Sequence, residues 1–299
     1  MIRLGFAVRT VQQPGLAGGS PPHLSITLTH LSDVIGYLER HAIRFYRFAL
    51  PRAITMADLV ECQNQLELLQ RRIAALNLRL GLHLDPALTL SHPDETIAAE
   101  AIAAIEVAAH LLAMLDQPGS TNHTLVIHAG ASDSAALARF AQRWPALSAT
   151  ARRRITIEHT TNGPALRALL GLATHTGAPI VFDYLHFQLH NPDRWSLPLA
   201  LGLCFATWPQ EVRPEVHLSS QRSEAHLLPG RNGATRVLPP RVGQHADFIV
   251  ARDAIELLAA SHGLPPFDLM LEAKAGDLAL LRLRHDLARY APNWADQVK

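Results

Sequence analysis

The chain has 299 residues, of which 48% are hydrophobic and 18% charged, and its mean hydropathy is +0.07. This composition excludes disordered, collagenous and coiled-coil proteins. Twenty-seven basic and 26 acidic residues leave a formal charge of +1, so no global field marks a nucleic-acid binder. The length suits one large domain or two modest ones, and we expect a single domain over residues 1–299.

The cysteines and the first residues predict a cytoplasmic protein. Cys62 and Cys204 form neither a CxxC pair nor a disulfide framework, which is typical of a reducing compartment. The opening Met1–Phe6 has the pattern of a strand and not of a signal peptide. The longest apolar stretch, Ala98–Leu115, contains two glutamates and a histidine, which we interpret as too polar for a membrane span.

Short apolar runs alternate with longer amphipathic segments along the chain. The runs are continuous rather than alternating, as expected of parallel strands buried on both faces. The predicted strands are Ile2–Val8, Phe45–Leu50, Arg79–Leu84, Thr124–His128, Ile155–Glu158, Ile180–Asp183, Val216–Ser219 and Asp268–Glu272. The predicted helices are Ile26–Arg40, Met56–Leu76, Pro93–Leu115, Ser134–Leu147, Pro164–Thr176, Asp247–His262 and Leu278–Tyr290.

Eight strand–helix units in about 300 residues predict an α/β fold, a single (β/α)₈ TIM barrel. A doubly wound open sheet is the alternative, because counting elements does not show closure. The connection near Ser196–Trp208 is the least defined. Pro14–Pro22 and Gln221–Gly243 are predicted to be loops.

Histidine, aspartate and glutamate occur where the predicted strands end. The residues concerned are His83, His128, Glu158, Asp183, His186, His217 and Glu272. The carboxyl ends of the strands build the site of a TIM barrel, and an unpaired charge there costs several kcal/mol. Any one of these histidines alone is more often a satisfied core residue. The joint pattern instead favours bound cations, which offset the repulsion among the carboxylates.

Several segments resemble the UV-damage endonuclease family, in the family's order and at similar spacing from Arg3 to about Leu287. The weaker segments are Arg3-Leu4-Gly5-Phe6 and Ile43-Arg44-Phe45-Tyr46-Arg47. The more specific ones are Val126-Ile127-His128-Ala129-Gly130, Ile155-Thr156-Ile157-Glu158, Val181-Phe182-Asp183 with His186, Thr207-Trp208, Val216-His217-Leu218-Ser219-Ser220, His245-Ala246-Asp247-Phe248-Ile249 and Met270-Leu271-Glu272-Ala273-Lys274. The resemblance implies a TIM barrel related in architecture to AP endonuclease IV. It also implies an enzyme that nicks DNA immediately 5′ of a lesion, in excision repair, with divalent metals.

The resemblance implies the metal ligands residue by residue, and it alone adds His245. They are His83, His128, Glu158, Asp183, His186, His217, His245 and Glu272. Glu158 would bridge two cations, the first shared with His83 and His128 and the second with Asp183, His217 and Glu272. His186 and His245 would hold a third. We therefore expect two or three divalent ions per chain, Mn²⁺ first, with Zn²⁺ or Fe²⁺ compatible with the same donors.

Two further residues join Glu158 as candidate catalytic groups. Lys274 follows Glu272 by two positions and could contact phosphate, although a structural salt bridge explains it equally well. Glu215 stands where the family has a lysine that is chemically modified in some members.

Other departures concern lesion recognition, because Pro86 and Ala87 replace a glutamine–aromatic pair that probes the duplex. The same applies to smaller changes at Phe6, Thr10 and His159.

The expected partner is damaged double-stranded DNA, bound by a monomer with no deducible protein partner. Arginines that follow strands or lie after strand seven are the predicted phosphate contacts, and they make binding salt-dependent. They are Arg9, Arg52, Arg222, Arg231, Arg236 and Arg241.

Two other functions fit part of the sequence. A sugar isomerase or epimerase on a similar barrel needs fewer ligands and one or two metals. A non-catalytic DNA-binding relic is the alternative from another class, and the intact ligand set argues against it.

Overall fold

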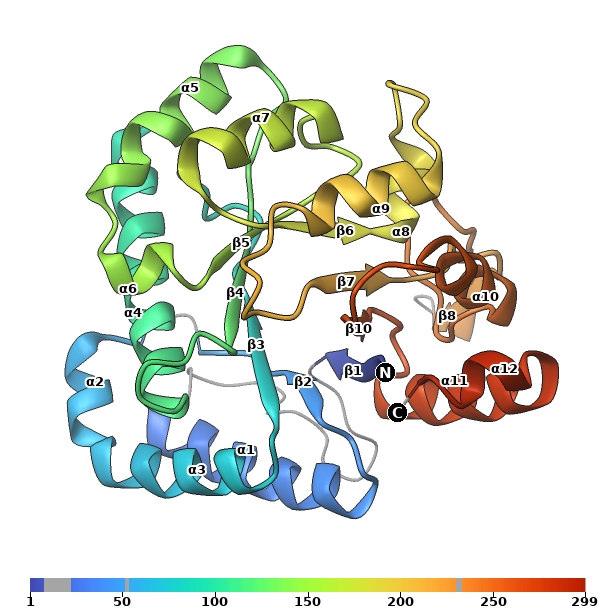
Figure 1. The fold of residues 1–299 in the computed structure, drawn as a ribbon, viewed down its shortest axis with the longest axis horizontal. Coiled ribbons are helices and arrows are strands. Elements are labelled where there is room, and N and C mark those ends of the chain that lie inside the picture. Colours follow the sequence, from blue (N-terminus) through green and yellow to red (C-terminus); the bar gives the residue numbers. More distant parts are fainter. Residues whose placement is uncertain (8–22, 52–53, 230–232, 299) are drawn as a thin grey trace.

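The computed structural model describes residues 1–7, 23–51, 54–229 and 233–298. In these residues eight parallel strands form a closed barrel in the order β1-β10-β7-β6-β5-β4-β3-β2 (Figure 1). The strands are β1 (Arg3–Ala7), β2 (Phe45–Arg47), β3 (Arg79–His83), β4 (Thr124–His128), β5 (Ile155–Glu158), β6 (Ile180–Asp183), β7 (Glu215–Leu218) and β10 (Asp268–Leu271). The predicted TIM barrel is confirmed, and the open-sheet alternative is wrong.

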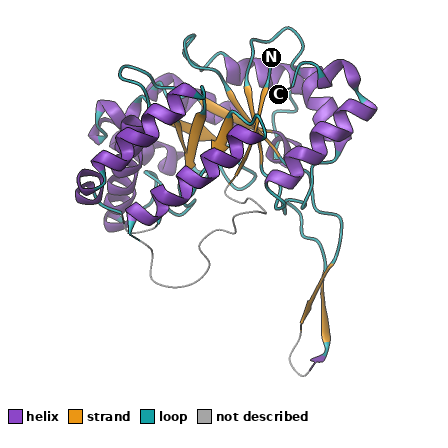
Figure 2. Ribbon diagram, turned by 90° about the horizontal axis from the view of Figure 1, so that it is seen from below, coloured by secondary structure: helices purple, strands orange, loops and turns teal. Residues whose placement is uncertain are grey.

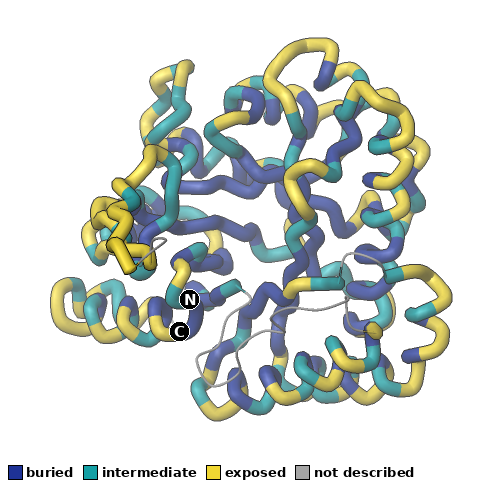
Figure 3. The backbone as a smooth tube through the Cα atoms, turned by 180° about the vertical axis from the view of Figure 1, so that it is seen from behind, coloured by how far each residue is buried: buried dark blue, intermediate teal, exposed yellow. Residues whose placement is uncertain are grey.

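Helices surround the barrel, and their apolar faces are buried against the strands while their outer faces are exposed (Figure 3). They are α1 (Leu24–Arg40), α2 (Met56–Glu61), α3 (Gln63–Ala75), α4 (Glu95–Leu115), α5 (Ser134–Arg143), η1 (Trp144–Ala146), α6 (Ala149–Arg152), α7 (Leu166–Thr176), α8 (Tyr184–Leu189), α9 (Leu197–Phe205), α10 (Ala251–Ala260), α11 (Asp277–Tyr290) and α12 (Pro292–Ala295).

Three of the segments that differ from the predictions change the arrangement of the elements most. The single helix predicted over Met56–Leu76 divides at Cys62, whose backbone (φ −94°, ψ 9°) ends α2 before α3 begins. The undefined connection near Ser196–Trp208 contains α9, which starts with a proline in its first turn. Gln221–Gly243 is not simply a loop, because it contains the antiparallel strands β8 (His226–Pro229) and β9 (Thr235–Leu238).

The α4 helix is long and apolar enough to cross a membrane by length and composition, with a hydropathy of 1.7 over its most apolar window. The prediction that its polar residues exclude a span is therefore not supported by hydropathy. Nine of its residues are buried, and Ile105, Leu111 and Leu112 among them are fully buried. Packing between β3, β4 and the neighbouring helices α3 and α6 accounts for this apolar composition.

A layer of buried charge fills the barrel near the amino-terminal ends of the strands. The Arg79 side chain is fully buried and donates to Asp268 at 2.7 Å, and it also contacts Glu215 at 3.3 Å. Arg3 approaches the same aspartate with two nitrogens, at 2.7 and 2.6 Å. Thr124 donates to Glu215 at 2.8 Å, so each carboxylate of the layer has partners.

The barrel closes between its first and last strands. β10 pairs with β1 on one side, with Arg3 opposite Asp268, and with β7 on the other. Ile2 forms a bridge with Val298, and the two termini lie close together (Figure 1).

The two-stranded β8–β9 sheet, here called the hairpin, projects away from the barrel (Figure 2). It follows β7, so it leaves the barrel from the end at which the strands terminate.

Candidate metal centre

Glu158, the last residue of β5, lies at the centre of the residues that end the barrel strands. Its Oε2 atom is 2.7 Å from Nε2 of His83 and 3.0 Å from Nε2 of His128. Its other oxygen, Oε1, is 2.8 Å from Nδ1 of His217. Because the register places His128 opposite Glu158 in the paired strands β4 and β5, the barrel itself brings these groups together.

A second group lies on the other side of Glu158. The donor atoms of Glu158, Asp183, His217 and Glu272 all lie within 4.8 Å of one another, as do those of His83, His128 and Glu158. These two groups share Glu158. They have the composition that the resemblance implied for the first two cations, so six of the eight proposed ligands are gathered in the described structure.

The hydrogen bonding of His83 fits a cation in the first group. Its Nδ1 is 2.8 Å from the carbonyl oxygen of Leu84, which only accepts, so Nδ1 carries the proton. In the neutral ring the Nε2 lone pair then faces Glu158 Oε2, which is also an acceptor. Such an arrangement is favourable only when a proton or a metal ion lies between the two.

Asp183 fits a cation in the second group. Its Oδ1 accepts from the backbone N–H of His186 at 2.7 Å, but its buried Oδ2 has no hydrogen-bond partner among the described residues. Burial and the nearby carboxylates of Glu272 and Glu158 raise the pKa of Asp183 to about 8. A cation bound here would give the buried oxygen a partner and would offset the repulsion among the carboxylates.

His217 is the main positive partner in this cluster. Burial opposes its charge, but Glu158 and Glu272 raise its pKa well above the ordinary value. Burial likewise opposes the ionisation of Glu158, but the charge of His217 and hydrogen bonds from His128 and His217 hold the pKa of Glu158 well below its usual range.

Arg47, at the end of β2, is a site residue that the sequence reasoning did not select. Its guanidinium is 2.6 Å from Oε1 of Glu272, and both side chains are largely buried. Burial opposes ionisation of Glu272, but the charges of Arg47 and His217 lower its pKa to about 2. The position of Arg47 at the end of a strand is the feature of the sequence that points to the site. An arginine at such a position can equally lie on the surface, and the sequence alone does not distinguish the two.

Glu215 lies beneath the cluster rather than in it. Its Oε1 is 3.1 Å from Nε2 of His217, and its Oε2 is held by Arg79 and Thr124. This leaves Nδ1 of His217 facing Glu158 and Glu272. Such a carboxylate–histidine pair fixes the orientation of a ligating ring, so the geometry gives Glu215 a positioning role.

His186 and His245 lie beside each other, with ring centroids 6.2 Å apart, but outside the two groups. Nδ1 of His245 donates to the carbonyl oxygen of Glu272, which leaves its Nε2 free to coordinate. Nδ1 of His186 accepts from the backbone N–H of Thr161 at 3.1 Å. Oγ1 of Thr161 lies 2.7 Å from the same nitrogen, so Thr161 fixes the orientation of the His186 ring.

The remaining predicted residues are distributed differently. Lys274 is exposed in the turn after β10. Arg222 is only 3% exposed and donates to the carbonyl oxygen of Pro239 at the base of the hairpin, so its predicted DNA contact is replaced by a structural one. Arg236 and Arg241 are exposed. The predicted contacts at Arg9, Arg52 and Arg231 lie outside the described residues, as does Thr10.

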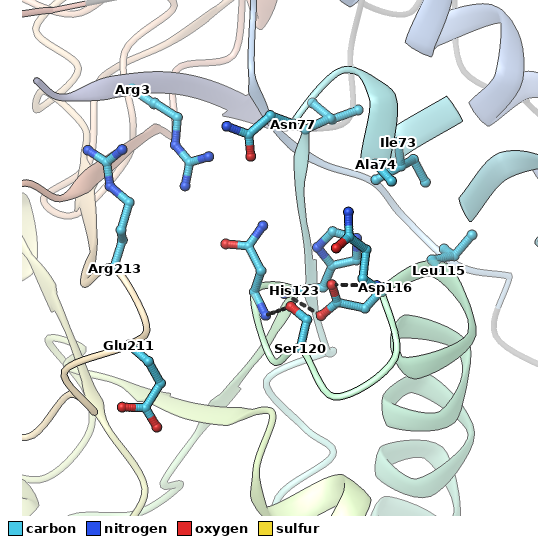
Figure 4. A pocket seen from close by; sticks show the side chains of 13 residues that line it. Arg3, Ile73, Ala74, Asn77, Leu115, Asp116, Ser120, His123, Glu211 and Arg213 are labelled. Carbon is cyan, nitrogen blue, oxygen red and sulfur yellow. Dashed lines mark hydrogen bonds between the residues drawn. The ribbon is translucent and has the colours of Figure 1, made fainter. Parts of the chain in front are cut away.

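The opposite end of the barrel holds a separate polar pocket of about 340 Å³ (Figure 4). Arg3 and Arg213 line one side, and Asp116, Ser120 and His123 line the other. Burial lowers the pKa of His123 to about 4. Residues at the amino-terminal ends of barrel strands generally serve stability, and this pocket is remote from the cluster around Glu158.

In (β/α)₈ barrel enzymes the active site lies at the carboxyl ends of the strands. The histidine–carboxylate cluster of this chain lies at that end of its barrel. The family model described as UV-endonuclease UvdE matches residues 24–294, and the chain belongs to this family. The UV DNA damage endonuclease of Bacillus velezensis is 28% identical over 281 residues, covering 89% of this chain and 82% of that protein.

Solved structures show the same fold. The crystal structure of SacUVDE superposes with a TM-score of 0.77 at 20% identity, covering 97% of this chain and 99% of that one. Endonuclease IV from Thermus thermophilus superposes with a TM-score of 0.60 at 16% identity, covering 96% of this chain and 99% of that one. An L-ribulose 3-epimerase gives 0.55 at 15% identity, covering 91% and 82%, so the barrel alone does not separate nucleases from epimerases.

Proposed function

We propose that this protein is a divalent-metal-dependent endonuclease that hydrolyses the phosphodiester bond 5′ of a lesion in double-stranded DNA, in excision repair. Family membership favours this function over a sugar epimerase. The observation that carries the proposal is Glu158, whose two oxygens face two separate groups of donors. We further propose a cytoplasmic monomer, consistent with two buried free cysteines.

The chain's own residues account for how such a site would be held. His83 and His128 would hold one cation, Asp183, His217 and Glu272 the other, and Glu158 both, with Mn²⁺ proposed first and a weaker third site at His186 and His245. When bound, the cations supply the charge that activates water and neutralises phosphate oxygens in phosphodiester hydrolysis.

Three other residues complete this proposal. Arg47 fixes Glu272, Glu215 fixes His217, and both restrict how far the ligands can move. Lys274, which is exposed beyond β10, is proposed to contact phosphate.

Metal content tests the proposal directly. Under metal-replete conditions we expect elemental analysis to find at least two divalent ions per chain. Asp183→Asn should lose about one, because Asp183 belongs to only one group of donors. Asp296→Asn, an exposed aspartate near the carboxyl terminus, is the matched control and should lose none. At most one ion in the wild-type protein would instead favour an epimerase-like site.

Substrate choice provides a second test. Pro86 and Ala87 are exposed after His83, and their side chains can neither donate hydrogen bonds nor stack on bases. Unstacking a nucleotide costs a few kcal/mol, and least where the duplex is already weakened. We therefore expect kcat/KM for an abasic site to exceed that for a cyclobutane dimer by at least about tenfold in matched duplexes. Equal or better cleavage of the dimer would contradict this expectation.

A further inference from the structure

The hairpin is attached directly beside the proposed metal ligands. Its first strand follows the segment that begins at His217, and its second strand returns to His245. At its base Gln221 forms a bridge with His245, and the backbone N–H of Arg222 donates to the carbonyl oxygen of Gln244 at 2.7 Å. A ligand that reaches the metal centre therefore lies next to the base of this hairpin.

The two faces of the hairpin differ in chemistry. Leu227 pairs with Val237 and Leu228 with Arg236, so these pairs point to opposite faces. The Leu227 and Val237 side chains are 69% and 59% exposed, although an isolated two-stranded hairpin has no core of its own. The other face presents the cation of Arg236 beside Leu228, which is 40% exposed. Both faces therefore carry uncovered apolar side chains, and the Arg236 face adds a positive charge.

The charge balance of this segment points to an anionic partner. Arg236 and Arg241 are exposed, and Glu224 is the single acidic residue between Gln221 and Gln244. Figure 2 shows the hairpin standing clear of the barrel, so both faces are open to such a partner.

We propose that the hairpin enters the groove of the DNA duplex beside the lesion, with Leu227 and Val237 wedged against the bases and Arg236 and Arg241 on phosphates. Apolar side chains of this size are used as wedges by proteins that unstack and bend DNA. The wedge supplies, from a different segment, part of the unstacking that Pro86 and Ala87 cannot provide, and the remaining cost still favours a duplex that is already weakened. This inference rests on the proposed function, because DNA is taken as the substrate.

The test measures unstacking without cleavage. The probe is a duplex with an abasic analogue, a non-hydrolysable linkage 5′ of it and 2-aminopurine beside it. Wild-type protein should raise the 2-aminopurine fluorescence, and the double variant Leu227→Ser/Val237→Ser should abolish most of the increase. Leu68→Ser, an equally exposed leucine on α3, is the control and should behave as wild type. Because no cleavage is required, failure to nick and failure to wedge are separate results.

Two further variants separate the basic and apolar roles. Arg236→Gln should weaken binding and reduce the slope of log K against log salt by about one, without changing the maximal fluorescence increase. Val237→Trp should show tryptophan quenching on addition of DNA.

The double variant must keep the wild-type circular dichroism spectrum and thermal midpoint. Unchanged 2-aminopurine fluorescence in a folded double variant would overturn the proposal. So would sedimentation showing that Leu227 and Val237 are instead covered in a dimer that the double variant dissociates.

Discussion

Glu158→Gln is expected to abolish nicking, with kcat falling by more than about a thousandfold. Loss of a group that only supports a metal ligand typically costs 10–100-fold, and Glu158 lies in both groups of donors, so the two effects should combine. His245→Ala should be much milder, at about 10–100-fold, because His245 lies outside both groups.

Glu95→Gln is the matched control for this experiment. The Glu95 side chain is 85% exposed on α4, where loss of its charge should leave kcat unchanged. Single-turnover nicking, combined with the metal content of each variant, separates loss of chemistry from loss of cations. Cleavage by Glu158→Gln at near the wild-type rate would show that the assigned centre is wrong.

Arg79→Met is expected to destabilise the fold by about 3–5 kcal/mol, because it leaves buried carboxylates without their shared cation. The side chains of Arg79, Asp268 and Glu215 are all completely buried. Arg167→Met removes an arginine whose ion pair with Asp193 has the same 2.7 Å distance but whose side chain is 67% exposed. This control substitution should lower the free energy of unfolding, measured in urea, by less than about 1 kcal/mol. Equal losses for the two variants would contradict a stabilising role for the buried layer.

The same layer predicts how stability depends on pH. Burial opposes ionisation of Glu215, but hydrogen bonding to His217 and the charge of Arg79 lower its pKa from 4.5 to about 2. A carboxyl group whose pKa is lower in the folded state than in the unfolded state stabilises the fold at pH values above its unfolded pKa. This contribution, about 3 kcal/mol, is lost as the pH falls from 4.5 to 2. In Arg79→Met the unfolding free energy should decline less steeply over that range.

The sequence located most of the candidate centre because of a property of parallel barrels. Strand ends converge on one ring, so His83, His128, Glu158 and Asp183 could be grouped without knowing any distance. His217 lies one residue before the end of its strand and faces the same cluster. The ionic layer was not predictable in this way. Arg79 and Asp268 begin strands that are far apart in the chain, and strand order alone does not reveal that their side chains meet inside the barrel.

The hairpin and Arg222 show a different limit. Asn232-Gly233 between two short apolar runs is a typical hairpin signal, and the arginine content of the segment obscured it. Arg222 has the same side chain as Arg236, but the fold buries one and exposes the other. Burial of an individual arginine depends on which backbone carbonyl groups lie within its reach, and the local sequence does not encode this.

The closure of the barrel between β1 and β10 has a consequence for synthesis on the ribosome. Glu272 follows directly after β10, and β10 pairs with β7 on one side and on the other with β1, which lies far earlier in the chain. A nascent chain that lacks this last strand has no Glu272 in the second group of donors and an unsealed barrel. The proposed nuclease would therefore stay inactive until β10 has been synthesised and has joined β1 and β7.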